Sequence, residues 1–213
     1  MRDEPKRQRD NRESDSPTAD VEKADVELGM KMASKRHHPA VKAAAAAGKF
    51  GDQGPLYALS SGVLIVGVTS RDRRVTDCAL SMLAAIAAAD LGKRLIKRLV
   101  RRTRPHVLLD EGRYKADAGG SEDKHEQSFP SGHTACTVAA ARALARNFPD
   151  TAAAGGAAAV ALGLSRIAKG AHWPLDVAAG AVIGLAAEAL SALIYEQCRA
   201  LASGSPRFTR HSG

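Results

Sequence analysis

Beyond its first fifty residues, this chain alternates long apolar segments with short charged ones. A helix that spans a membrane needs about 20 predominantly apolar residues, and the longest segments reach or approach that length. We therefore expect an all-α fold, a polytopic membrane helical bundle of about five spans. The apolar segments cover residues 54–70, 75–92, 134–148, 151–165 and 175–195.

Small residues favour helices that pack closely inside a membrane. Gly180 and Gly184 form a GxxxG pattern, which lets two helix backbones approach each other in lipid. Alanine dominates over β-branched residues and no segment alternates with a period of two, so we expect no strands. A soluble bundle with an alanine-rich core is the alternative, because the mean hydropathy of the whole chain is negative. The polar first fifty residues account for that value.

The polar first part of the chain divides into two segments. The first is rich in both signs of charge and poor in large apolar residues, which predicts disorder. From Asp20 to Lys35 the pattern is that of an amphipathic helix, which would lie on a membrane or pack on the domain. No apolar run follows a basic start, so we expect no cleavable signal peptide. The predicted division is a disordered tail over 1–18, amphipathic or interfacial helices over 19–53, the membrane domain over 54–198 and a C-terminal tail over 199–213.

The net charge of the chain is +8, which indicates an anionic partner: nucleic acid, anionic lipid or a phosphorylated substrate. Aromatic residues make up only 4% of the chain, which argues against nucleic-acid recognition by base stacking. Cys78, Cys136 and Cys198 are far apart and show no metal or redox spacing. We therefore expect membrane lipids and phosphorylated substrates as partners, no nucleic acid, and no disulfide framework.

A basic run from Lys93 to Arg104 follows the second apolar segment. If the helix continues out of the membrane, Lys93, Lys97 and Arg101 share one face. Pro105 would end that helix and leave Arg104 at the helix end. Such a run also fits a collar that contacts lipid headgroups. Lys97 and Arg104 therefore become candidates for phosphate binding only together with two further clusters.

The second cluster is Pro130-Ser131-Gly132-His133, immediately before the third apolar segment. Pro, Ser and Gly before an apolar run predict a helix start, where free backbone N–H groups and the helix dipole attract anions. Gly132 would let a phosphate approach closely, and His133 would be placed to donate a proton. Taken alone, the pattern is also that of an ordinary helix cap.

The third cluster contains Arg166, His172 and Asp176, between the last two apolar segments. Arginine offers a planar fork for phosphate oxygens. Pro174 suits the first position of a new helix, so Asp176 would fall in the first turn of that helix. From there its carboxylate would accept the Nδ1 proton of His172, which leaves Nε2 of His172 as a nucleophile. An Asp cap beside an unrelated His is the alternative for these residues alone. Because the clusters follow alternate spans, we expect all three to meet at one membrane face.

Together these residues resemble the type-2 phosphatidic acid phosphatase superfamily, whose signature is the three motifs KxxxxxxRP, PSGH and SRxxxxxHxxxD. The chain matches every motif position in the same order, within about residues 55–195. The resemblance implies a helical core like that of the acid phosphatases and haloperoxidases. The motif residues are Lys97, Arg104 and Pro105, then Pro130 to His133, then Ser165, Arg166, His172 and Asp176.

The resemblance also implies a metal-independent phosphatase that needs no cofactor. His172 would attack phosphorus and form a phosphohistidine, while Asp176 would orient it. His133 would protonate the leaving alcohol and then activate water. The implied phosphate-binding residues are Lys97, Arg104, Ser131, Gly132 and Arg166.

The leading function is hydrolysis of a phosphate or diphosphate monoester on a membrane lipid, such as phosphatidate, phosphatidylglycerophosphate or a polyprenyl (di)phosphate. A phosphatase of the same fold that acts on a soluble ester is the alternative. A non-catalytic protein that binds anionic lipids is a third, against which His133, His172 and Asp176 argue, because binding alone needs only the basic residues. We expect an integral multi-pass protein of a bacterial plasma membrane. The sequence leaves open which face carries the site and whether the protein is a homo-oligomer.

Overall fold

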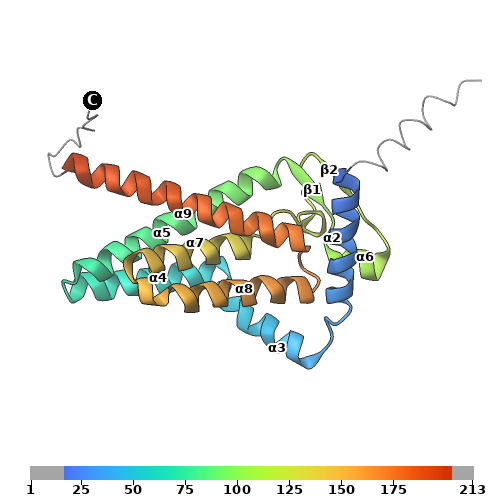
Figure 1. Cartoon of the computed structure of the whole chain (residues 1–213), viewed down its shortest axis with the longest axis horizontal. Coiled ribbons are helices and arrows are strands. Elements are labelled where there is room, and N and C mark those ends of the chain that lie inside the picture. Colours follow the sequence, from blue (N-terminus) through green and yellow to red (C-terminus); the bar gives the residue numbers. More distant parts are fainter. Residues whose placement is uncertain (1–16, 203–213) are drawn as a thin grey trace, which may run out of the picture.

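The computed structural model describes residues 17–202, and helices dominate that part of the chain (Figure 1). Residues 1–16 of the predicted disordered tail and residues 203–213 of the predicted C-terminal tail lie outside the described part. The α-helices are α2 (Pro17–Ala33), α3 (Pro39–Ala47), α4 (Gln53–Thr69), α5 (Arg73–Lys97), α6 (Pro105–Glu111), α7 (Gly132–Asn147), α8 (Ala152–Ala168) and α9 (Pro174–Ala202). The 3₁₀ helices are η1 (Gly48–Gly51), η2 (Lys124–Glu126) and η3 (Pro149–Thr151), and the strands are β1 (Val100–Arg102) and β2 (Ala116–Ala118).

Helix α7 lies in the middle of the bundle and packs against α5, α8 and α9 (Figure 1). The faces in contact consist largely of alanine, and Ala89, Ala135 and Ala139 are fully buried. A Cβ atom at Gly184 would lie 2.5 Å from the carbonyl oxygen of Ala135, so α9 can lie this close to α7 only with glycine there. The close approach predicted from the GxxxG pattern is confirmed.

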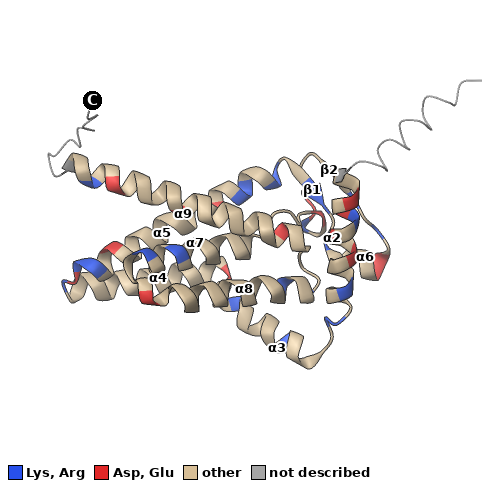
Figure 2. Ribbon diagram, viewed as in Figure 1, with Lys and Arg blue, Asp and Glu red and all other residues tan. Residues whose placement is uncertain are grey.

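Within residues 17–202, three helical segments are long and apolar enough to cross a membrane: α5, η3 together with α8, and α9. Helix α4 is apolar but has only 17 residues, and α7 has 16 residues and carries Arg142 and Arg146. Large apolar side chains such as Ile65, Val160 and Leu193 are exposed on α4, α8 and α9, and most of α8 and α9 is free of charge (Figure 2). These features are those of a membrane protein, and the count of about five spans stays a prediction.

The segment between α5 and α7 is not helical throughout. Helix α5 ends at Lys97, and the chain continues into β1, which pairs antiparallel with β2. The expectations of a helix through Arg101 and of no strands are therefore wrong. Strands of three residues are too short to show an alternating pattern in the sequence. An ion pair of 2.6 Å between Arg101 and Asp117 joins the two strands. Pro105 begins α6 instead of ending a helix, since its missing N–H suits a first helical position. Arg104 still lies at a helix end, as the residue before α6.

Helix α2 crosses the end of the bundle and contacts α6, α8 and α9 (Figure 1). Asp25 and Ala33 on this helix are buried, whereas Val21 and Leu28 are exposed. The helix packs on the domain through the side that carries Asp25 and Ala33, and contact of its exposed apolar side chains with a membrane stays a prediction. The helix begins at Pro17, so the last two residues of the predicted tail are helical.

Candidate active site

The three sequence clusters surround one cavity of about 280 Å³, which we call the histidine cavity. The end of α5, the start of α6, the start of α7 and the loop before α9 all contribute to it. The predicted meeting of the clusters is thus what the structure shows. The cavity is lined by Gln53, Lys93, Lys97, Arg104, Gly132, His133 and His172. The other predicted site residues, Ser131, Arg166 and Asp176, lie outside this lining.

His172 is held with its Nε2 atom free for chemistry. Its Nδ1 atom lies 2.8 Å from the carbonyl oxygen of Ser128. Because a carbonyl only accepts, Nδ1 carries the proton and Nε2 keeps its lone pair. The Asp176 carboxylate lies 3.6 Å from the same Nδ1, so the hydrogen bond predicted for Asp176 goes to Ser128 instead. Burial lowers the pKa of His172 more than Asp176 raises it, which favours the neutral imidazole.

Asp176 is fully buried, and three donors satisfy its carboxylate. Arg102 donates to Oδ1 at 2.8 Å, while Oδ2 accepts from the Ser128 hydroxyl at 2.5 Å and from the Trp173 N–H at 2.8 Å. A buried carboxylate needs such partners because an uncompensated charge in the interior is strongly destabilising. Its place in the first turn of α9 adds the favourable end of the helix dipole. Asp176 is therefore a fixed negative charge beside His172.

His133 lies in the first turn of α7 and is more open to solvent than His172. Its side chain is 34% exposed, and its Nε2 atom pairs with the carboxylate of Asp52, the residue before α4. The same carboxylate accepts from Arg166 at 3.0 Å. The two histidine rings are 6.5 Å apart, centre to centre. One acidic residue thus joins the histidine of the second motif to the arginine of the third.

Two arginines of the site have an unused donor. The Nε atoms of Arg104 and Arg166 are buried and have no hydrogen-bond partner among the described residues. A buried donor without a partner costs about 1–3 kcal/mol, and an anion in the cavity would be within reach of Arg104, which lines it. The Nζ atom of Lys97 donates to the carbonyl oxygen of Gln127 at 2.5 Å, which holds this ammonium group at the cavity. The side of the cavity facing the histidines is therefore suited to an anion.

Ser131 and Gly132 shape the start of α7. The Ser131 side chain is buried; its hydroxyl lies 2.9 Å from the Thr134 hydroxyl and accepts from the Thr134 N–H at 3.5 Å. Ser131 is therefore the helix cap and does not line the cavity, unlike the phosphate contact expected from the resemblance. A Cβ atom on Gly132 would lie 2.7 Å from Cδ of Lys93, so this lysine reaches over the helix start only because the residue is glycine.

Sequence reasoning missed several residues that shape the site. Gln53 and Lys93 line the cavity, Asp52 pairs with His133, and Ser128 and Arg102 hold Asp176. The basic residues among them were assigned to a general lipid-contacting collar. A signal did exist for Arg102. In an extended chain, residues two positions apart point to the same side, so Arg102 would share a side with Arg104, the arginine of the first motif. The others carry no motif.

The fold and the cavity define a class of protein: a helical membrane bundle with a buried, oriented histidine in a cavity lined by basic side chains. The chain belongs to the PAP2 superfamily, whose family model matches residues 78–200. This match contains all three motifs and most of α5 through α9. Helices α2, α3 and α4 lie outside it.

Relatives of known activity include two phosphatases of lipid-linked phosphates. Lipid A 1-phosphatase of Rhizobium etli is 34% identical over 125 residues, 59% of this chain and 53% of that protein. Decaprenylphosphoryl-5-phosphoribose phosphatase of Mycobacterium tuberculosis is 40% identical over 94 residues, 42% of this chain and 46% of that protein. Non-specific acid phosphatase of Salmonella typhi is 35% identical over 88 residues, 41% of this chain and 35% of that protein. The chain thus spans about half, or less, of the length of these relatives.

Two solved structures share the fold. LpxE of Aquifex aeolicus superposes with a TM-score of 0.55 at 26% identity, covering 78% of this chain and 92% of that one. The transmembrane PAP2-type phosphatidylglycerolphosphate phosphatase of Bacillus subtilis gives a TM-score of 0.58 at 21% identity, covering 86% of this chain and 89% of that one. The second likeness shows the fold alone.

Proposed function

We propose that this protein hydrolyses a phosphate monoester carried by a membrane lipid, through a phosphohistidine at His172. The observation that carries the proposal is the hydrogen bond of 2.8 Å between Nδ1 of His172 and the carbonyl of Ser128. It leaves Nε2 as the nucleophile in a cavity that also presents Lys97 and Arg104. The phosphatase activity named for the three relatives supports the same chemistry here.

In the first step, Nε2 of His172 attacks phosphorus and the bond from phosphorus to the lipid oxygen breaks. His133 gives its proton to that leaving oxygen, which contributes about 10²–10⁴-fold in reactions of this kind. Asp176 stabilises the positive charge that develops on the imidazole as the N–P bond forms.

In the second step, water attacks the phosphorus of the phosphohistidine. His133 takes a proton from that water, the N–P bond breaks, and inorganic phosphate leaves with His172 back in its neutral form. Burial and the positive charge of Arg166 lower the pKa of His133 to about 4. The carboxylate of Asp52 works against this, because it stabilises the protonated form of His133 that exists before the first step and after the second.

The phosphate oxygens would lie against Lys97 and Arg104, and against the backbone N–H of Gly132 at the start of α7. Arg166 lies outside the cavity lining and would have to turn its unpaired Nε atom towards them. Preorganised positive charge of this kind is usually the largest contribution to phosphoryl transfer. These cations and the helix end supply it, so the proposed reaction proceeds without a metal ion.

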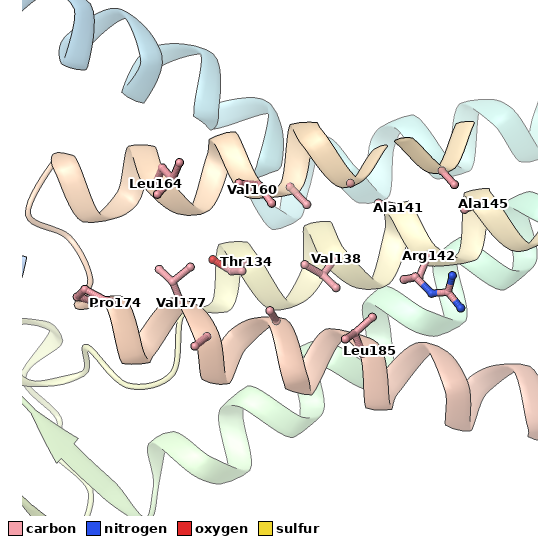
Figure 3. A pocket seen from close by; sticks show the side chains of 15 residues that line it. Thr134, Val138, Ala141, Arg142, Ala145, Val160, Leu164, Pro174, Val177 and Leu185 are labelled. Atoms are coloured by element: carbon pink, nitrogen blue, oxygen red, sulfur yellow. The ribbon is translucent and has the colours of Figure 1, made fainter. Parts of the chain in front are cut away.

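An apolar groove of about 450 Å³ between α7, α8 and α9 favours a lipid over a soluble substrate (Figure 3). Thr134 and Pro174 lie at one end of the groove and Arg142 lies towards the other (Figure 3). Thr134 follows His133 in the chain, and Pro174 is two residues from His172, so the groove begins next to the histidine cavity. A lipid with its phosphate in the cavity would place an apolar chain along the groove.

The relatives support the same class of substrate. Two of them are named for the phosphates of large lipids, lipid A and a decaprenyl-linked sugar. The acid phosphatase among them keeps a soluble phosphate ester as the alternative. The groove favours the lipid, because each buried CH₂ group contributes about 0.8 kcal/mol to binding.

Phosphate release by the purified protein in mixed micelles tests the proposal. The panel holds phosphatidate, phosphatidylglycerophosphate, a polyprenyl phosphate, lipid A and the soluble ester p-nitrophenyl phosphate. We expect kcat/KM for at least one lipid to exceed that for the soluble ester by about tenfold or more, the effect of two buried CH₂ groups, and activity to survive EDTA. Preference for the soluble ester would favour the alternative, a phosphatase of soluble phosphate esters. Loss of activity with EDTA would exclude the metal-independent mechanism. Binding of the lipid without turnover would indicate a non-catalytic lipid-binding protein.

A variant that fills the groove tests the role of the lipid chain. Gly156 lines the groove, and a Cβ atom there would meet nothing within 4 Å, so the side chain of Gly156→Leu would start in open space and occupy the groove. We expect it to lower kcat/KM for the lipid and to leave the soluble ester unchanged. The matched control is Ala157→Leu, an exposed position on α8 outside the groove lining. An equal loss on both substrates would contradict a binding role of the groove.

A further inference from the structure

Helix α2 lies outside the residues that the PAP2 family model matches, yet it carries a buried charge to the site. The side chain of its Asp25 is 3% exposed, and that of Arg102, its partner, is 5% exposed. Leaving one member of such a pair buried without the other is strongly destabilising. The burial of this pair therefore requires that α2 stay in place on the domain.

Asp25 has two contacts that both lead to Asp176. Its Oδ2 atom accepts from Arg102 at 2.6 Å, and Arg102 donates with its other terminal nitrogen to Asp176 at 2.8 Å. Its Oδ1 atom accepts from the backbone N–H of Leu175 at 2.8 Å. Leu175 precedes Asp176 in the first turn of α9. Asp25 thus fixes both the cation that holds Asp176 and the backbone that carries it.

The surroundings leave this arrangement little freedom. The Arg102 guanidinium lies 5.4 Å from the centre of the Trp173 ring, and Trp173 is fully buried and donates to the carbonyl of Thr103 at 2.6 Å. A Cβ atom on Gly29 would lie 2.4 Å from the same ring, so α2 reaches this depth only because it has glycine there. Trp173 follows His172 in the chain, which places α2 directly behind the nucleophile.

We propose that Asp25 is a positioning residue for the nucleophile, acting through Arg102 and Asp176 on His172, and that α2 is thereby part of the active site. This inference rests on the proposed role of His172. Without Asp25, the carboxylates left to Arg102 would be Asp176 and the partly exposed Glu22, 3.0 Å away, and its Nε atom would keep the Tyr114 hydroxyl at 3.3 Å. The guanidinium would then shift towards Glu22 and solvent. The effect falls on the chemical step, because Asp25, Arg102 and Asp176 do not line the histidine cavity.

The test compares Asp25→Asn with Glu27→Gln, which removes an exposed carboxylate from the same helix. Asparagine keeps an acceptor for the Leu175 N–H but loses the charge that faces Arg102. The readout is the single-turnover rate constant of phosphohistidine formation, after alkaline quench, with the preferred lipid substrate. We expect it to fall about 10- to 100-fold in Asp25→Asn, as small misplacements of reacting groups do. Competitive inhibition by inorganic phosphate should not change, and Glu27→Gln should match the wild type.

The rate constant separates positioning from a structural role. A protein that is only less stable would give a smaller amplitude of phosphoenzyme at an unchanged rate constant, and that result would overturn the proposal. Weaker inhibition by phosphate would also overturn it, because the effect would then lie in binding.

Arg102→Lys is the second variant. It keeps the positive charge but loses the fork that contacts Asp25 and Asp176 at once. Arg102→Lys should lower the same rate constant by a similar factor. A double variant that combines it with Asp25→Asn should be no slower than the slower of the two single variants, because both residues act through one chain of contacts. If Asp25→Asn does not fold, the rate constant of Arg102→Lys decides. Turnover by the wild type and its loss in His172→Ala establish the proposed function separately, so failure of this inference is distinguishable from failure of that one.

Discussion

His172 and His133 line the same cavity with ring centres 6.5 Å apart, yet their surroundings are opposite. The side chain of His172 is 4% exposed, and its Nδ1 atom is bonded to a main-chain carbonyl. That of His133 is 34% exposed, and its Nε2 atom is paired with the carboxylate of Asp52. Burial lowers the pKa of both imidazoles, that of His133 to about 4, but one is fixed by a main-chain carbonyl whereas the other faces a carboxylate.

This difference matches the two tasks in the proposed reaction. A nucleophile must be neutral and correctly aimed, which burial and a fixed tautomer provide. A group that gives a proton and later takes one must be able to carry charge and to meet water, which partial exposure and a nearby carboxylate provide. In the proposed reaction, two identical side chains thus take different roles in one cavity through their depth and their partners.

Replacing the buried histidine has the largest expected effect. His172→Ala removes the atom that forms the N–P bond, so phosphate release from a lipid substrate should fall by more than about 10³-fold, as loss of a catalytic nucleophile does. The elution profile in detergent and the unfolding temperature should match those of the wild type. Turnover within tenfold of the wild type would show that His172 is not the nucleophile.

Replacing the exposed histidine should have a smaller effect that depends on the leaving group. His133→Ala should lower turnover of a lipid substrate by about 10²–10⁴-fold. With p-nitrophenyl phosphate, the burst of nitrophenol should persist, because nitrophenolate leaves without a proton. Burst-phase kinetics measure this directly. Loss of the burst would mean that His133 has another role, such as binding the phosphate.

Removing the carboxylate partner of His133 should cost less again. Asp52→Asn takes away a charge that favours protonated His133, so kcat should fall by about tenfold, a fraction of the full contribution of the acid. The pair is partly exposed, with the Asp52 side chain 41% accessible, and such pairs contribute about 0–1 kcal/mol to stability. The unfolding temperature should nevertheless fall, because the same variant removes the carboxylate that faces Arg166, whose side chain is only 7% exposed. Asp150→Asn, an exposed carboxylate before α8, is the control, and equal effects of both variants would contradict the prediction.

The smallest effect is in the pH dependence. Burial lowers the pKa of His172, and the nucleophile must be neutral, so its reactive form persists to more acidic pH than for an exposed histidine. With p-nitrophenyl phosphate, whose leaving group needs no proton from His133, we expect the burst rate constant to hold down to below a pH of about 6.5, the ordinary value for histidine, and to fall only at lower pH. A pH–rate profile measures this limb. A decline that begins above pH 7 would indicate a nucleophile with a raised pKa.

Much of the fold and of the site could be predicted because the relevant patterns are local. The helix starts at Ser131 and Pro174 follow from neighbouring residues, and the apolar segments follow from composition over about 20 positions. Once the helices are placed, the motif residues must meet at one end of the bundle. That geometry is why Lys97, Arg104 and His172 line one cavity.

The contacts that the sequence did not reveal join single polar residues far apart in the chain. Asp52 contacts Arg166 across 114 positions, and Asp25 contacts Arg102 across 77. A lone carboxylate leaves no periodic mark, and on a polar helix such as α2 it resembles its solvent-exposed neighbours. The choice between Ser128 and Asp176 as the acceptor for His172 depends on distances below 4 Å, which residue spacing cannot resolve.

The starts of α7 and α9 are joined by backbone alone. The Ser131 N–H donates to the carbonyl of Asp176 at 2.9 Å, and a Cβ atom at Gly180 would lie 2.4 Å from the carbonyl oxygen of Ser131. The consequence is mechanical: sliding α9 along α7 would break this hydrogen bond and bring a larger side chain than Gly180 against the Ser131 carbonyl. We therefore expect the starts of the two helices to move together as one rigid unit.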